Sequence, residues 1–74
     1  MATKEQYEQG AKNLATKVKE TKNLLRKSEE LQYLGNLRWS QYWSTGEERT
    51  RKLAINCYKA SERLYSLEAD SRPL

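Results

Sequence analysis

The 74-residue chain contains no histidine, and this absence removes several kinds of chemistry at once. Histidine is the commonest acid or base near neutral pH and the commonest protein ligand of metal ions. The chain also has a single cysteine, Cys57, so it lacks a set of thiolates for zinc and lacks an imidazole to activate that thiol. We therefore expect no metal and no cofactor.

Carboxylates and glycines are present, but their spacing suits neither catalysis nor phosphate binding. The adjacent glutamates form two pairs, Glu29/Glu30 and Glu47/Glu48. Neighbours on an α-helix point about 100° apart, so neither pair converges on one site. The three glycines, at positions 10, 35 and 46, are too scattered for a phosphate-binding loop. We expect the chain not to be an enzyme.

Long apolar runs are missing too. No stretch approaches the ~20 apolar residues that span a bilayer, and the first four residues lead into polar sequence rather than into the apolar segment of a signal peptide. A lone cysteine fits a reducing compartment. We expect no membrane span and a cytoplasmic location, with the nucleus left open.

The feature that the sequence does contain is helical periodicity. Thr3 and Gln6 fit a capping box, after which apolar residues recur at three- and four-residue spacing. Gly35 fits either a helix end or a kink, and Thr45 with Glu48 fits a second capping box. The pattern predicts a helix over about 3–34, a short helix or continuation over about 37–43, a helix over about 46–69 and a frayed tail over 70–74. The fold class is a single all-α domain, residues 1–74: a helical hairpin or three-helix bundle with an antiparallel return helix.

One stretch carries a partial family resemblance. The segment Tyr33–Asn36, followed by Ala54 and Tyr58, is similar to part of a tetratricopeptide helix pair, although more residues separate Gly35 from Ala54 than in that pattern. The resemblance covers about half of the chain. It implies that small residues let two antiparallel helices approach closely.

The core predicted from this composition is thin. Leu, Ile and Val total twelve residues and Phe is absent, so two Trp and five Tyr must supply much of the buried surface. A small domain that lacks a metal ion and a disulfide bond can gain further stability by associating with another chain. We expect the chain to form an oligomer with itself or to bind another protein.

Large apolar side chains supply the candidate protein-interaction residues. The expected anchors are Trp39, Tyr42 and Trp43, and the expected secondary contacts are Leu24, Leu31 and Ile55. Trp and Tyr are enriched at binding hot spots. The alternative is that these aromatic rings, with Tyr33, form the core against the return helix.

A basic stripe is the second candidate surface. On one continuous first helix, Lys4, Lys12, Lys19, Lys22 and Arg26 would fall within an arc of about 80°, joined further on by Arg38. Lys22 and Arg26 would be a repelling i, i+4 pair, which hints at an acidic partner. The alternative is an ordinary solvated face.

These observations favour a non-enzymatic protein-interaction module: an adaptor, an assembly subunit or an inhibitor. The alternative function is nucleic-acid binding through the basic stripe, which would depend steeply on salt.

Overall fold

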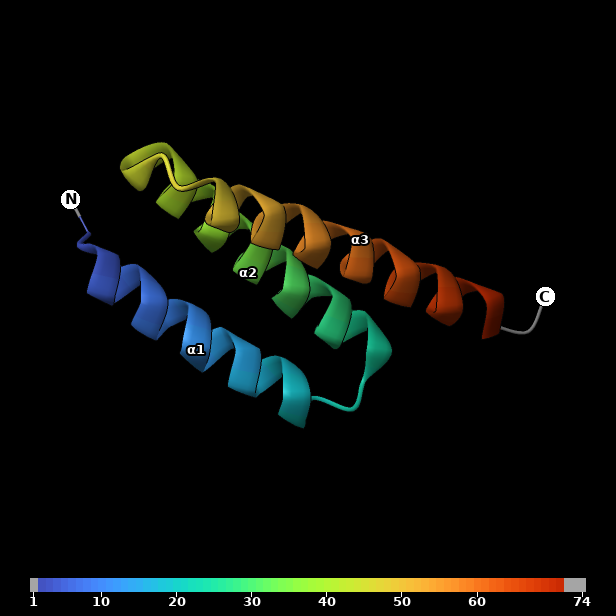
Figure 1. Cartoon of the computed structure of the whole chain (residues 1–74). Helices are drawn as coiled ribbons and strands as arrows, with labels where there is room; N and C mark the ends of the chain where they lie inside the picture. The colour runs from blue at the N-terminus through green and yellow to red at the C-terminus, as the bar shows by residue number, and fades with distance from the viewer. Residues whose placement is uncertain (1, 72–74) are drawn as a thin grey trace.

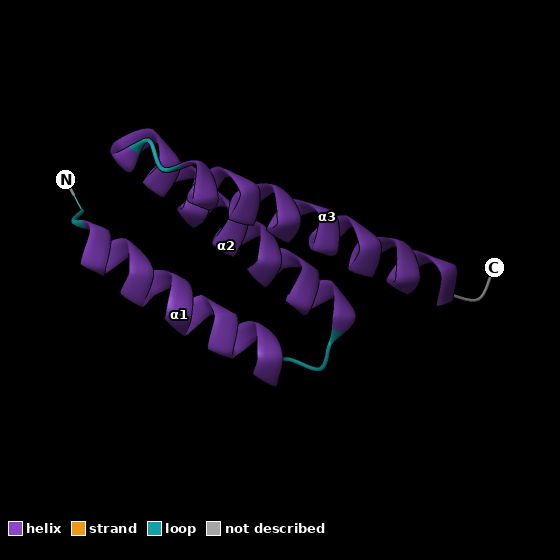
Figure 2. Ribbon diagram, viewed as in Figure 1, coloured by secondary structure: helices purple, strands orange, loops and turns teal. Residues whose placement is uncertain are grey.

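The computed structural model describes residues 2–71, which form three α-helices and no strand. Helix α1 spans Lys4–Glu20, α2 spans Leu24–Thr45 and α3 spans Glu48–Ser71 (Figure 2). The all-α prediction with an antiparallel return helix is confirmed. Helix α3 includes Asp70 and Ser71, which had been predicted to belong to a frayed tail, and the rest of that tail, 72–74, lies outside the described residues.

Helix α2 occupies the middle of the molecule (Figure 1). It runs antiparallel to both neighbours and packs against each of them. Within the described part of the chain, no Cα atom of α1 comes within 8 Å of a Cα atom of α3. The three helices therefore form an open bundle in which two outer helices share a central one.

The chain turns where the sequence predicted a continuous helix. The expected helix over 3–34 is wrong because α1 ends at Glu20 and α2 begins at Leu24. The Asn23 side chain accepts a hydrogen bond from the backbone N–H of Arg26 at 3.0 Å and so caps α2. Thr21 adopts extended backbone angles and ends α1. The break thus comes from caps, without glycine or proline.

Gly35 neither ends nor begins a helix, since α2 continues through it to Thr45. The short helix over about 37–43 is accordingly the second half of α2. The turn predicted near Gly46 is confirmed, and Gly46 has φ +72°, where glycine is favoured. The second capping box, predicted at Thr45 and Glu48, is wrong: Thr45 is the last residue of α2, and its Oγ1 accepts from the backbone N–H of Glu47 at 3.2 Å.

The helices contact one another through small and polar residues. The buried apolar side chains in the described residues are Ala11, Val18, Leu34 and Ala54. The buried polar ones are Ser28, Glu30, Gln41, Thr50 and Ser61. Most of the larger apolar side chains remain half-buried around this narrow core.

The close approach of two helices that the tetratricopeptide resemblance implied is present between α2 and α3. A Cβ atom added at Gly35 would lie 2.7 Å from Cε1 of Tyr58, and Ala54 is fully buried. The aromatic ring of α3 therefore lies against the backbone of α2, where only glycine leaves room.

Candidate functional site

Helices α1 and α3 leave two sides of α2 uncovered: a wide side that carries its exposed residues, Tyr33 and Trp43 among them, and a narrower side of half-buried residues between α1 and α3. Helix α2 meets α3 through Ser28 and Gly35, and it meets α1 through Leu37 and Gln41. Gln41 lies six residues after Gly35, which places the two contact directions about 120° apart around α2. We name the side of the molecule between α1 and α3, over α2, the open face.

Apolar side chains lie at the centre of the open face. Leu31 of α2 falls between the two contact directions, and Leu53 and Leu64 project from the same side of α3. All three are half-buried, and Ala15 on the facing side of α1 is exposed. The Cys57 thiol belongs to this side as well: burial raises its pKa, and the nearby Arg38 guanidinium acts in the opposite direction.

A polar cluster joins the three helices at one end of the open face. Oε1 of Glu8 on α1 accepts hydrogen bonds from Arg38 at 3.0 Å, from Gln41 at 3.0 Å and from Arg49 at 2.6 Å. The Gln41 amide is fully buried and its Oε1 accepts from Arg38 at 2.9 Å. The bonds from Gln41, Arg49 and Arg38, in that order, lower the pKa of Glu8 to about 2. We name Glu8, Arg38, Gln41 and Arg49 the Glu8 cluster.

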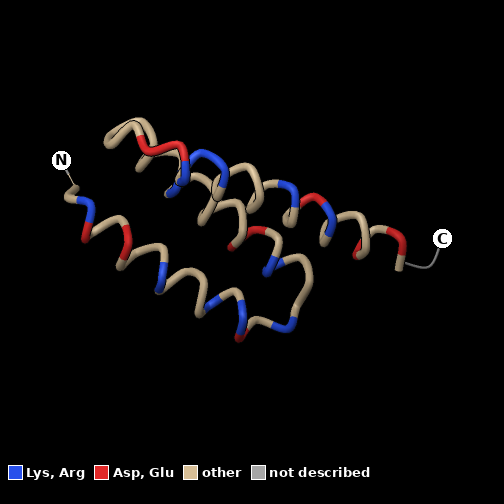
Figure 3. Tube along the Cα trace, viewed as in Figure 1, with Lys and Arg blue, Asp and Glu red and all other residues tan. Residues whose placement is uncertain are grey.

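The positive charge of the chain is concentrated on the open face. Basic residues occur on all three helices (Figure 3). Those that project to the open face by helical spacing include Lys12, Lys19, Lys27, Arg38, Arg49 and Arg63. The carboxylates Glu5, Glu8 and Glu68 project there as well. Cations therefore outnumber carboxylates on this face.

The predicted basic stripe is divided by the turn at residues 21–23. Lys12 and Lys19 lie on the open face, whereas Lys22 lies in the loop and Arg26 lines a hollow with Glu29 and Tyr33 on the other side. Lys22 and Arg26 are therefore not an i, i+4 pair of one helix. Arg38 belongs to the Glu8 cluster, and its side chain is 15% exposed.

The predicted aromatic anchors do come together. The ring centroids of Trp39 and Tyr42 are 5.8 Å apart, and those of Tyr42 and Trp43 are 6.1 Å apart. Trp43 is 73% exposed, while Trp39 and Tyr42 are half-buried. Trp43 points about 140° away from Arg38 around α2, so the exposed indole and the open face belong to different sides of the helix.

The secondary apolar contacts do not join this aromatic cluster. Leu24 lies near the other end of α2, about 27 Å from Tyr42 along the helix axis. Leu31 lies on the open face. Ile55 projects from the outer side of α3, and all three side chains are half-buried.

Neither the Glu8 cluster nor the buried Glu30 was predicted from the sequence. Glu30 is 4% exposed; its Oε2 accepts from the Thr21 hydroxyl at 3.0 Å, and its Oε1 has no hydrogen-bond partner among the described residues. A capping asparagine before two leucines was the signal for the turn at 21–23. Once that turn is placed, Glu30 faces the end of α1.

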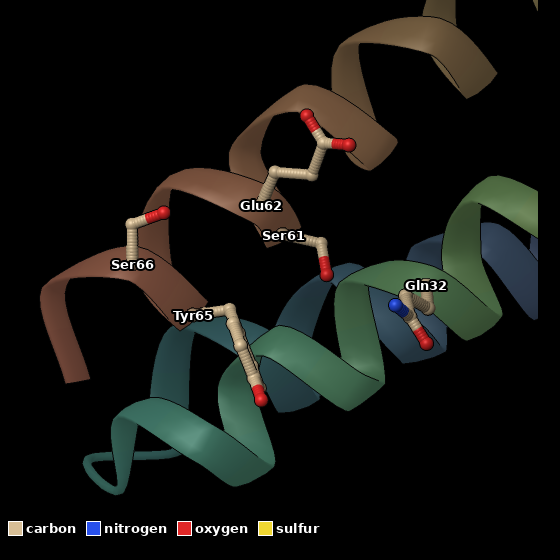
Figure 4. A pocket seen from close by; sticks show the side chains of 5 residues that line it. All are labelled: Gln32, Ser61, Glu62, Tyr65 and Ser66. Carbon is tan, nitrogen blue, oxygen red and sulfur yellow. The ribbon is translucent and has the colours of Figure 1, made fainter. Parts of the chain in front are cut away.

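A shallow recess between α2 and α3 lies on the side away from α1. Gln32, Ser61, Glu62, Tyr65 and Ser66 line it, and the Tyr65 side chain points from α3 towards α2 (Figure 4). Tyr65 is itself 61% exposed. Amide, hydroxyl and carboxylate groups line the recess, without a cation among these five residues, which makes it a weaker candidate than the open face.

Comparison with family models, curated proteins and solved structures finds no match to this chain. None of the helices in residues 2–71 is long and apolar enough to cross a membrane. The same residues contain no group of three His, Cys, Asp or Glu side chains that could hold a metal ion.

Proposed function

We propose that the chain is a non-enzymatic protein-interaction module that covers its apolar and aromatic surface with a second chain, either a copy of itself or another protein. It would serve as an adaptor, an assembly subunit or an inhibitor of its partner, and would work in the cytoplasm.

The observation that carries this proposal is the exposed area. The chain exposes 5576 Å², whereas a monomeric globular protein of 8.7 kDa exposes about 4,700 Å². The excess of about 900 Å² is comparable to one partner's usual share of a stable protein interface, about 800 Å². Partner binding would remove this excess and stabilise the narrow core.

The aromatic cluster supports the same proposal. The Trp43 indole lies against the half-buried Tyr42 ring, which in turn lies against Trp39, and most of the Trp43 surface remains in water. A large side chain that is fixed on a helix loses little conformational entropy on binding. Trp43 is therefore the side chain that we expect to anchor a partner.

Sedimentation equilibrium at low and high salt tests the proposal. We expect concentration-dependent association that persists at high salt, because apolar burial drives it. Trp43→Ala should weaken this association about tenfold, and Tyr33→Ala, which removes another exposed ring of α2, should weaken it less. Unchanged association in a folded Trp43→Ala variant would contradict the anchor role.

The nucleic-acid alternative draws on the charge of the open face. Phosphate contacts would make the affinity fall steeply as salt is added. Each contact would add about one unit to the slope of log affinity against log salt concentration. The exposed Trp43 ring points away from those cations, so base stacking and phosphate contacts would not fall on one surface. Binding to single-stranded DNA that survives high salt would exclude this use of the lysines.

A further inference from the structure

We infer that the open face binds an acidic amphipathic α-helix of a partner protein. This inference rests on the proposed function, because it names the partner chemistry for one surface of the interaction module.

The shape of the open face fits a helix. Helices α1 and α3 run parallel on either side of α2 without contacting each other along their backbones. A fourth helix that lies over α2 would pack against both of them, as helices do at axial distances of 8–10 Å. The Glu8 cluster joins α1 to α3 at one end of the face, so a partner helix would lie along the remaining residues of α1, 9–20, over about 18 Å.

The centre of the face supplies apolar contacts. Leu31, Leu53 and Leu64 are half-buried in the free chain, and Ala15 opposite them is small and exposed. Leucine-type side chains at i, i+3, i+4 and i+7 of a partner helix would cover these positions. Ala15 leaves room for the partner backbone to come close to α1 at that point.

The charge of the face selects an acidic partner. Lys12, Lys19 and Arg63 are exposed on the rims and form no ion pair within residues 2–71. Glu8 and Glu47, by contrast, already have basic partners. The free charge at the rims is therefore positive, and glutamates on the flanks of a bound helix would complement it.

A second copy of the chain is a poorer occupant of this face. The chain carries +4 and cations outnumber carboxylates on the open face, so two open faces in contact would repel each other. A nucleic-acid strand would also fit this face less well, because phosphate contacts with the basic rims would leave Leu31, Leu53 and Leu64 exposed. The apolar centre and the basic rims together match a helix with an apolar stripe and acidic flanks.

Fluorescence anisotropy with two labelled model peptides tests the inference on the full chain. One peptide is an ~18-residue helix of leucine, alanine and glutamate with leucine at i, i+3, i+4 and i+7, and the other replaces every glutamate by lysine. We expect the acidic peptide to bind at least about tenfold more tightly. Added salt should weaken binding of the acidic peptide without abolishing it, because the apolar contacts remain.

Two matched variants locate the binding surface. Ala15→Glu adds a negative charge to the open face, and Ser40→Glu adds the same charge to an exposed position on the far side of α2. We expect Ala15→Glu to weaken binding of the acidic peptide about tenfold, and Ser40→Glu to change it less than about twofold. Circular dichroism of both variants checks that they keep their helix content.

Several outcomes would overturn the inference. Equal affinity for the two peptides, equal effects of the two variants, or tighter binding of a single-stranded oligonucleotide would each do so. Self-association that Ala15→Glu weakens and Ser40→Glu does not would make a second copy the occupant. If neither peptide binds while the chain still self-associates, the named partner is wrong and the interaction module stands. If the chain binds neither peptide and does not self-associate, both the inference and the proposed function are contradicted.

Discussion

The hydroxyl oxygens of Ser28 on α2 and Ser61 on α3 lie 2.9 Å apart in a buried contact. The Ser28 hydroxyl lies 3.0 Å from the backbone carbonyl oxygen of Ser61, and the Ser61 hydroxyl lies 2.8 Å from the backbone carbonyl oxygen of Ser28. Each serine is thus placed to bond the backbone of the other helix. The contact holds the two helices at a distance that larger side chains would not allow.

Removing either hydroxyl should therefore cost stability. We expect Ser61→Ala to lower the free energy of unfolding by about 1 kcal/mol, since a buried hydrogen bond is lost. The double variant Ser28→Ala/Ser61→Ala should cost less than the sum of the two single changes, because both remove one shared contact. Urea unfolding of the four proteins measures this coupling, and strictly additive losses would show that the serines act separately.

The contact of Gly35 with the Tyr58 ring makes a second prediction. Glycine to alanine inside a helix ordinarily stabilises it by about 1 kcal/mol. At Gly35 the new methyl group would lie 2.7 Å from Cε1 of Tyr58, whose hydroxyl is held by Asn36 at 2.5 Å. We expect Gly35→Ala to lower the free energy of unfolding by about 1–2 kcal/mol through overpacking.

Gly10 supplies the matched control for that prediction. Its added Cβ would lie 3.2 Å from Cδ2 of Leu37, the mobile end of a flexible side chain. Gly10→Ala should leave stability unchanged or raise it, because helix propensity then decides the outcome. If thermal unfolding places Gly35→Ala at or above the wild type, the α2–α3 contact is looser than described.

The sequence predicted those features that depend on local signals. The capping box at Thr3, the turn at Gly46 and the all-α class each follow from residues close together in the chain. The turn at 21–23 was missed because Val18, Thr21 and Leu25 continue the helical spacing across it. The capping preference of Asn23 competed with that spacing and prevailed.

The candidate site was less predictable because it depends on how the helices pack. Glu8, Arg38 and Arg49 belong to three different helices, and their meeting requires the register of all three. The division of the basic residues between two sides likewise follows from the missed turn. The aromatic cluster was found because i, i+3 and i+4 neighbours meet on any helix.

Buried Glu30 makes a third prediction. A carboxylate that is 4% exposed, with one oxygen unpartnered among the described residues, pays a desolvation cost that its bond to Thr21 offsets in part. We expect Glu30→Gln, which keeps the shape and removes the charge, to raise the free energy of unfolding by about 1 kcal/mol. Urea unfolding measures the change.

Glu29, the neighbour of Glu30 in the sequence, serves as the control for this prediction. Glu29 is exposed, so Glu29→Gln should change the free energy of unfolding by less than about 0.5 kcal/mol. A clear loss of stability in Glu30→Gln would mean that the buried charge itself stabilises the end of α1, and the explanation by desolvation would fail.

The lowered pKa of Glu8 predicts how stability responds to acid. Folding lowers this pKa from 4.5 to about 2, so the folded chain holds the carboxylate charged where the unfolded chain would protonate it. The stabilisation is complete above pH 4.5 and disappears as the pH falls towards 2. Glu8→Gln should therefore be less stable than the wild type above pH 4.5, and the difference between the two should shrink towards pH 2.

The size of this difference is limited by solvent. The Glu8 side chain is 36% exposed, so we expect about 1 kcal/mol at neutral pH, and less at high salt. Thermal unfolding of both proteins across the acid range measures the difference, and Glu5→Gln, an exposed change on the same helix, controls for the loss of one negative charge. A difference between wild type and Glu8→Gln that stays constant down to pH 2 would mean that Glu8 stabilises the fold through its shape and hydrogen bonds, and that its charge is not what joins the three helices.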